Sequence, residues 1–316
     1  MQVFVSGPSF APGFGVSAGI ACAIGNGQVL SYGVGLQGFR LSYFDDDDED
    51  VSQLGAFFLP NLVNNTVWLT VATTLCDDDQ DVQQATSAGG DIQAGLVAIV
   101  GHPSELTGNG DPTVGNWYNL QNSTPLPPPG YPQLIGPTQV TGGFAMAGFS
   151  ATANGGEEME EFSLNVQTPT FSVTSHQQWC MGSAVTASAT NLTVLSHVLG
   201  FYAGNIPASQ VSVQNIHFQG ANEQYWGVGG AVDATFPFTP TYAVPMISAV
   251  NMYMTDSSGS ETSDTIETIG FLNCSGPSLA SSMEWYYWIY MVNSTSSGGV
   301  NQSGGCSGQI MALASV

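Results

Sequence analysis

The chain has 316 residues, and Arg40 is its only lysine or arginine against 24 acidic residues, so its formal net charge is −23. Nucleic acids and anionic membrane surfaces are bound mainly through such cations, and a chain of this charge repels them at long range. No stretch reaches the roughly 18–20 apolar residues of a membrane-spanning helix. We therefore expect no nucleic-acid partner and no membrane insertion.

The composition is that of a folded protein with an almost uncharged polar surface. Hydrophobic residues make up 43% of the chain and charged residues only 8%, well below the usual charged fraction. The surface must then consist mainly of serine, threonine, asparagine, glutamine and glycine. Such a surface favours an extracellular or surface-associated protein, or one built into an assembly. The length favours two or three domains.

Strand patterns recur along the chain as short apolar runs, rich in valine, threonine and aromatic residues and bounded by glycine and proline. The first set covers 36–43, 51–58, 67–71 and 94–99. The second set covers 146–152, 160–164, 171–173 and 193–195, and the third covers 250–255, 266–272, 287–292 and 308–313. A helix competes only over 278–292, where the tryptophan and tyrosine residues favour a strand.

The three sets form an internal repeat, in which each copy reads strand, acidic loop, strand, strand, polar loop, strand. A shift of 110 positions superposes Gly38 on Gly148, and Leu54 on Leu164, without a gap. Repeats of this size indicate tandem copies of one structural unit.

Two proline-rich passages, 125–132 and 236–245, divide the chain because they must be extended. The sequence therefore predicts an all-β fold of tandem β-sandwich modules, either immunoglobulin-like or jelly-roll-like. The expected units are a first module over 1–124, a proline-rich linker over 125–137, a second module over 138–235 and a third over 236–316.

Acidic residues are concentrated in two loops of the first copy, and calcium favours several oxygen ligands in irregular loops of this kind. The candidate calcium ligands are Asp45, Asp46, Asp47, Asp48, Glu49, Asp50, Asp77, Asp78 and Asp79. The alternative is a solvated charge run that keeps a lysine-free chain soluble.

None of the five cysteines lies in a C-x-x-C pair, so neither a structural zinc site nor a thioredoxin-type motif is expected. A disulfide between Cys274 and Cys306 is one candidate, and a pair between Cys22 and Cys76 is another. The alternative is that all five are small buried apolar side chains. Six Asn-x-Ser/Thr sequons are candidate glycosylation sites: Asn64, Asn122, Asn191, Asn273, Asn293 and Asn301.

Motifs of catalysis are missing from the sequence. The glycines of 33–38 match G-x-G-x-x-G, but the following residues read as a strand, whereas a dinucleotide site requires a helix there. The four histidines lack the spacing of a zinc helix, and no G-x-S-x-G elbow occurs. We expect no enzyme.

These observations favour a non-enzymatic structural subunit of an extracellular or particle assembly, such as a filament, coat or surface layer, with calcium as a candidate stabilising ion. Its main partner is then another copy of itself. The first alternative is a calcium-dependent, lectin-like protein that binds glycans through aromatic pairs such as Trp117–Tyr118 and Tyr225–Trp226. The second alternative is a secreted hydrolase, which requires a cleft with perturbed titratable groups.

Overall fold

A computed structural model of the chain describes the backbone of fourteen segments. These are residues 1–10, 17–22, 24–42, 51–77, 92–108, 111–120, 141–153, 162–167, 183–185, 192–219, 228–256, 265–274, 280–294 and 302–316. In these segments the chain forms antiparallel strands and one 3₁₀ turn, η1 (Pro103–Glu105), with no α-helix. The all-β prediction is confirmed, and β17 (Ser282–Ser294) confirms the strand preferred over a helix there.

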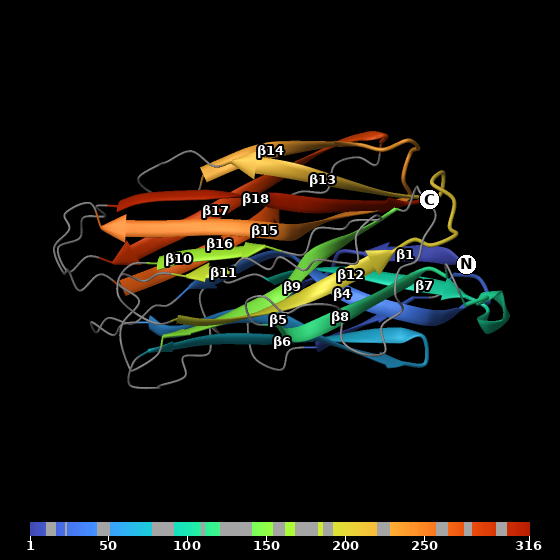
Figure 1. Cartoon of the computed structure of the whole chain (residues 1–316), viewed down its shortest axis with the longest axis horizontal. Coiled ribbons are helices and arrows are strands. Elements are labelled where there is room, and N and C mark those ends of the chain that lie inside the picture. The colour runs from blue at the N-terminus through green and yellow to red at the C-terminus, as the bar shows by residue number, and fades with distance from the viewer. Residues whose placement is uncertain are drawn as a thin grey trace.

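The described strands form three sheets that extend along the long axis of the molecule (Figure 1). Sheet A has seven strands, in the order β1 (Gln2–Ser6), β7 (Ile92–Gly101), β4 (Gln28–Ser42), β16 (Thr265–Cys274), β17 and β14 (Val228–Thr235), with β2 (Ser9–Phe10) beside β7. Sheet B has six strands, in the order β3 (Ser17–Ala21), β6 (Thr66–Asp77), β5 (Val51–Val63), β9 (Gly142–Ala153), β12 (Leu192–Tyr202) and β8 (Thr113–Leu120). Sheet C has five strands, in the order β11 (Ser183–Val185), β10 (Phe162–Gln167), β15 (Tyr242–Asp256), β18 (Gln302–Ser315) and β13 (Val211–Gln219).

Three long strands, β4, β9 and β15, come one from each expected module. Each pairs on one edge with a strand of its own module and on the other edge with a strand of another module, so the three modules are linked in a cycle. Along one edge they pair with β7, β12 and β18, respectively. Along the other edge they pair with β16, β5 and β10. Every sheet therefore contains strands from at least two of the three expected modules, and sheet A contains strands from all three.

A β-bulge lies at a corresponding place in each of the three long strands. The ladders skip Gln37 in β4, Ala147 in β9 and Ser248 in β15. A bulge increases the local twist and bends its strand. The three sheets share two hydrophobic cores, with side chains from all of them in each core.

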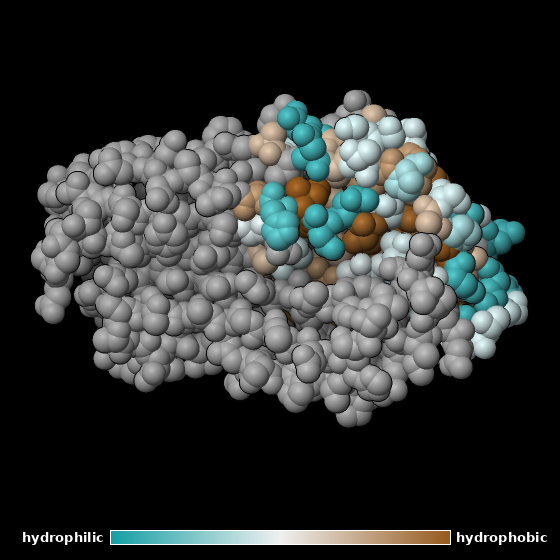
Figure 2. Space-filling model, turned by 45° about the horizontal axis from the view of Figure 1, so that its top comes forward, coloured by the Kyte–Doolittle hydropathy of each residue, from teal (hydrophilic) through white to brown (hydrophobic). Residues whose placement is uncertain are grey.

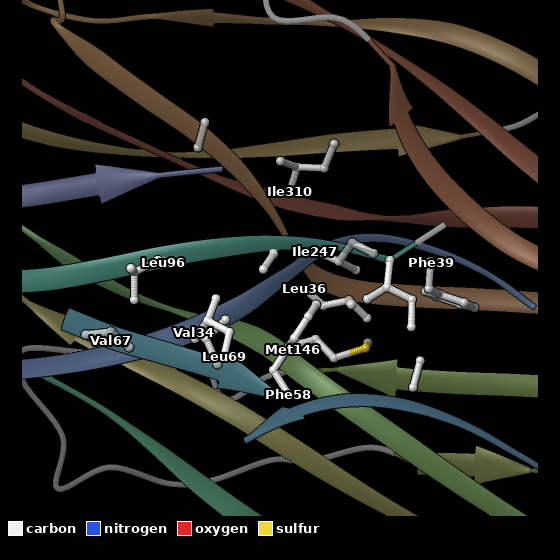
Figure 3. Packing of buried hydrophobic residues seen from close by; sticks show 14 of the residues in the cluster. Val34, Leu36, Phe39, Phe58, Val67, Leu69, Leu96, Met146, Ile247 and Ile310 are labelled. Atoms are coloured by element: carbon white, nitrogen blue, oxygen red, sulfur yellow. The ribbon is translucent and has the colours of Figure 1, made fainter. Parts of the chain in front are cut away.

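The larger core combines residues of sheets A, B and C, as the labelled side chains of Figure 3 illustrate. Val34 and Leu96 of sheet A, Phe58 of sheet B and Ile310 of sheet C are almost fully buried in it. The second core also draws on all three sheets, and we call it the Met246 cluster. Its fully buried members include Val97, Ile99, Ala145, Leu199, Met246, Met311 and Leu313.

Glycine permits the close approach of sheet A to Met246 of sheet C. A β-carbon on Gly35 would lie 2.5 Å from Sδ of Met246, and one on Gly95 would lie 2.6 Å from Cγ of the same side chain. Neighbouring atoms do not approach so closely without a shift. The two glycines thus make the space that Met246 fills.

The free edge of β4 is capped by a side chain from β8. β4 pairs with β16 only beyond residue 38, so among the described strands its earlier residues have β7 as their one ladder partner. Asn116 takes the place of a strand there: Val34 N donates to Asn116 Oδ1 over 2.8 Å, and Asn116 Nδ2 donates to Val34 O over 2.7 Å. The glycine motif of 33–38 is part of this strand and opens no helix.

Candidate functional site

The expected calcium ligands lie almost entirely outside the described residues. This holds for Asp45, Asp46, Asp47, Asp48, Glu49, Asp50, Asp78 and Asp79. Asp77 is the last residue of β6 and pairs with Val51, the first residue of β5. The acidic segments 43–50 and 78–91 are therefore attached at the same end of the β5–β6 hairpin, and the calcium site stays a prediction. Among the described residues, no group of three or more metal-ligating side chains is present.

Cys22 is a free, fully buried thiol, which contradicts its expected pairing with Cys76. Burial raises the pKa of this thiol to about 11, against a smaller opposite effect of a backbone hydrogen bond from Val67. For this residue the alternative of a small buried apolar side chain is correct. Cys274 lies in β16 of sheet A and Cys306 in β18 of sheet C, and their disulfide stays a prediction.

The sequon at Asn64 lies in the turn between β5 and β6. Asn64 and Asn65 have φ angles of 48° and 61°, the positive values that a two-residue type I′ hairpin turn requires. Asn64 is exposed, whereas Asn65 accepts a hydrogen bond from Val29 N over 3.0 Å. Asn273 and Asn293 lie in β16 and β17, and the sequons at Asn122, Asn191 and Asn301 lie outside the described residues.

Among the buried titratable side chains, His197 most resembles a catalytic residue, and 4% of its surface is exposed. Its ring stacks on Phe57 with 4.7 Å between centroids and lies 5.3 Å from the ring of Tyr118. Burial lowers the pKa of His197 to about 4, so the ring is neutral at physiological pH. Within the described part of the chain, its Nδ1 has no hydrogen-bond partner.

This row of aromatic rings depends on Gly148, which pairs with both Phe57 and His197. Its φ angle is +149°, and a β-carbon there would lie 2.3 Å from Cβ of Phe57. The rings of the two neighbouring strands therefore meet across the glycine. Packing of this kind stabilises a sheet at a glycine position, and we interpret the row as structural.

Two other carboxylates form local loop contacts. The N-terminal ammonium group donates to Glu105, and this bond, with a second one from His102 N, holds the pKa of Glu105 below its usual value. Asp111 accepts from Thr107 N over 3.0 Å and from Gly108 N over 2.7 Å. Each carboxylate fixes a short turn, so neither is a candidate for catalysis.

An exposed face of sheet B is the strongest candidate for an interaction site. Alternate residues of three adjacent strands point to it, and we call it the β3–β6–β5 face. It consists of Ser17, Gly19, Ala21, Thr66, Trp68, Thr70, Leu59, Asn61 and Val63. Three large hydrophobic side chains are partly exposed there: Leu59 by 44%, Val63 by 45% and Trp68 by 43%. None of the nine residues is charged.

The Trp68 indole packs against Gly19 of the neighbouring strand. A β-carbon on Gly19 of the neighbouring strand would lie 2.9 Å from Cε2 of the Trp68 indole. The glycine thus leaves space for the ring to lie on the backbone of β3. Asn61 pairs with Trp68 on the opposite side. The result is a partly exposed indole with an amide, hydroxyl groups and aliphatic side chains around it.

The face is far from the points where the acidic segments join the same hairpin. Ten residues of β5 separate Val51 from Asn61, which corresponds to about 33 Å of extended chain. The ends of β5 and β6 to which those segments are joined are therefore remote from Trp68.

The sequence pattern of β6 contained a signal for this face. Valine and leucine occupy positions 67, 69 and 71, whereas Trp68 alternates with Thr66 and Thr70. A period of two therefore places Trp68 on the threonine side, which is the exposed one. Of the aromatic pairs expected to bind glycans, Trp117 and Tyr118 lie in β8, and Tyr225 and Trp226 lie outside the described residues.

Comparisons with known proteins give no family: no protein-family model matches the chain, and no curated protein matches it significantly. In the described segments, no helix is long and apolar enough to cross a membrane.

Proposed function

We propose that the protein is a non-enzymatic structural subunit of an extracellular or particle assembly, built from three related β units. The observation that carries the proposal is the β3–β6–β5 face. Three large hydrophobic side chains are exposed there on an uncharged surface, in a chain with a single arginine and no lysine. Contacts between such subunits must be apolar or hydrogen-bonded, because ion pairs between protein side chains are almost impossible.

The strand registers support the three related units. The 110-residue shift in the sequence superposes Leu54 on Leu164. In the ladders, Leu54 pairs with Ala151, three residues after Gly148, and Leu164 pairs with Met252, three residues after Ala249. Gly148 and Ala249 each follow a bulge residue. The superposed leucines therefore have equivalent partners, as copies of one unit arranged in a cycle should have.

The buried titratable groups support a non-enzymatic role. His197 packs between aromatic rings and has its pKa lowered by burial. A histidine that acts as a general base requires an orienting partner and a nucleophile within reach. Glu105 and Asp111 are engaged in their own turns.

A second candidate function is glycan binding through the same face. An exposed indole beside an amide and hydroxyl groups, here Trp68 with Asn61 and Thr70, is a surface on which a sugar ring stacks. Exposed Leu59 and Val63 favour a protein contact instead, because aliphatic side chains offer sugars no hydrogen bond. We therefore keep self-association as the first proposal.

Sedimentation velocity and electron microscopy test the proposal. We expect oligomers or polymers that grow with concentration. Lowering the pH toward about 4, near the reference pKa of carboxylates, should promote association by reducing the net charge. Calcium should promote it if the acidic segments bind the ion, and a chelator should then reverse the effect. A protein that stays monomeric under all these conditions is not a structural subunit.

A further inference from the structure

The charge distribution of the chain restricts what can cover the β3–β6–β5 face. A second copy brings 24 acidic side chains with it and the same net charge of −23, so two copies repel each other at long range. The coloured residues on the side turned to the viewer in Figure 2 include both hydrophilic and hydrophobic ones. In sheet A, Asp233 and Glu284 are both exposed and directly opposite each other on β14 and β17. Like charges in such a pair are unfavourable even within one copy.

The β3–β6–β5 face avoids this repulsion. Its nine residues carry no charge, and about 33 Å of strand separates Trp68 from the attachment points of the acidic segments. Two copies that meet through this face bring together indole, aliphatic, amide and hydroxyl groups only. A cationic partner would gain nothing here, because there is no carboxylate for it to pair with.

We propose that two copies of this chain pack their β3–β6–β5 faces against each other around a twofold axis. The contact is isologous, so Trp68 and Leu59 of one copy lie against the same face of the other. The proposal rests on the proposed function and names the surface through which subunits meet. Face-to-face packing of two sheets at about 10 Å is the ordinary geometry of such a contact.

The contact is weak by itself. Three strands and five residues of length give a face of roughly 250 Å² at the usual strand spacings. A stable pair of proteins buries about 800 Å² on each partner. This contact therefore operates at high concentration, or together with other contacts that hold the subunits of an assembly near one another.

A matched pair of leucine variants tests the surface. Leu59 on the face and Leu106 outside it are both 44% exposed. We expect Leu59→Ser to weaken association in sedimentation equilibrium at least tenfold, and Leu106→Ser to leave it unchanged. Both replacements are at exposed sites, and melting curves verify that each variant is folded. Equal effects of the two variants would overturn the proposal.

A charge-swap experiment tests the twofold geometry. Asn61→Asp and Asn61→Lys should each weaken self-association, because an isologous contact places like charges near one another. An equimolar mixture of the two variants should associate more strongly than either one alone. Only a contact in which the face meets itself predicts this recovery. A mixture no stronger than its components would overturn the isologous contact.

The outcomes separate this inference from the function on which it rests. If oligomers persist in the Leu59→Ser variant, the protein is still a structural subunit, but its copies do not meet through this face. A wild-type protein that remains monomeric at every concentration overturns both. A monomer that binds a panel of neutral oligosaccharides and loses that binding in Trp68→Ser replaces both with the glycan-binding alternative.

Discussion

Glycine lies beneath a large side chain in two different regions of the molecule. In the interior, Gly35 and Gly95 face Met246, which is fully buried between sheets A and C. On the surface, Gly19 faces Trp68, whose indole is 43% exposed. The same device has different consequences. In the interior it sets how closely two sheets approach, whereas on the surface it leaves space for an indole that stays partly exposed.

The largest expected effect on stability comes from producing one module without the other two, which supply most of the Met246 cluster. The Met246 cluster combines residues from all three sheets, so the expected middle module, 138–235, should not fold when produced alone. In the full chain its strands β9 and β12 pair with β5 and β8 of the first module. Circular dichroism should give no cooperative melting transition. A stable, cooperatively folding fragment would make the shared core dispensable and would support independent modules.

A substitution at the interior glycine Gly95 should lower the free energy of unfolding more than one at the surface glycine Gly19. Gly95→Val places a β-carbon 2.6 Å from Cγ of Met246, with two methyl groups beyond it. Overpacking of this kind costs about 3 kcal/mol in the free energy of unfolding. Chemical denaturation measures the loss. Met246→Ala in the same chain should recover part of it, and strictly additive effects would contradict the contact.

A third glycine, Gly148, should have an effect between those of the interior and the surface glycines. The effect of its neighbour His197 on the pH dependence of stability measures how well the His197 ring is buried. The pKa of His197 is about 4 in the folded protein, against an ordinary value of 6.5. The unfolded chain therefore binds the proton first, and stability is lost as the pH falls below about 6.5. Between about pH 7 and pH 5 the loss should be on the order of 2 kcal/mol.

Denaturation of the wild type and of His197→Leu at both pH values isolates this contribution. The variant should lose less stability on acidification, because the carboxylates titrate alike in both proteins. Identical pH dependence would mean that the imidazole is already accessible to protons in the folded state.

The smallest expected effect is at the surface glycine. Gly19→Ala places a β-carbon 2.9 Å from the indole of Trp68, but this ring has space to move outward. We expect a change within about 0.5 kcal/mol in the free energy of unfolding, as is usual for surface positions. Denaturation checks this value, and tryptophan emission should shift to longer wavelength as the ring is lifted. A loss as large as that of Gly95→Val would remove the distinction between the two regions.

The sequence alone determined the class of fold and the general character of the surface. Apolar runs with a period of two, separated by glycine, proline and acidic segments, predict parts of strands such as β4, β9 and β15, whereas β1, β3, β8, β13 and β14 lie outside the predicted runs. The near absence of cations follows directly from composition. The alternation of Trp68 with Thr66 and Thr70 even marks the exposed side of β6.

The tertiary structure decided which strands become neighbours. A strand pattern states which side chains share a face, but it does not name the partner that completes its hydrogen bonds. β5 therefore pairs with β9 and β4 with β16, across boundaries that the proline-rich passages suggested. The same limit applies to Cys22, because only packing decides whether a thiol has another cysteine or a hydrophobic core beside it. Pairing over such distances depends on the cores that several sheets bury together, and a local pattern contains no information on them.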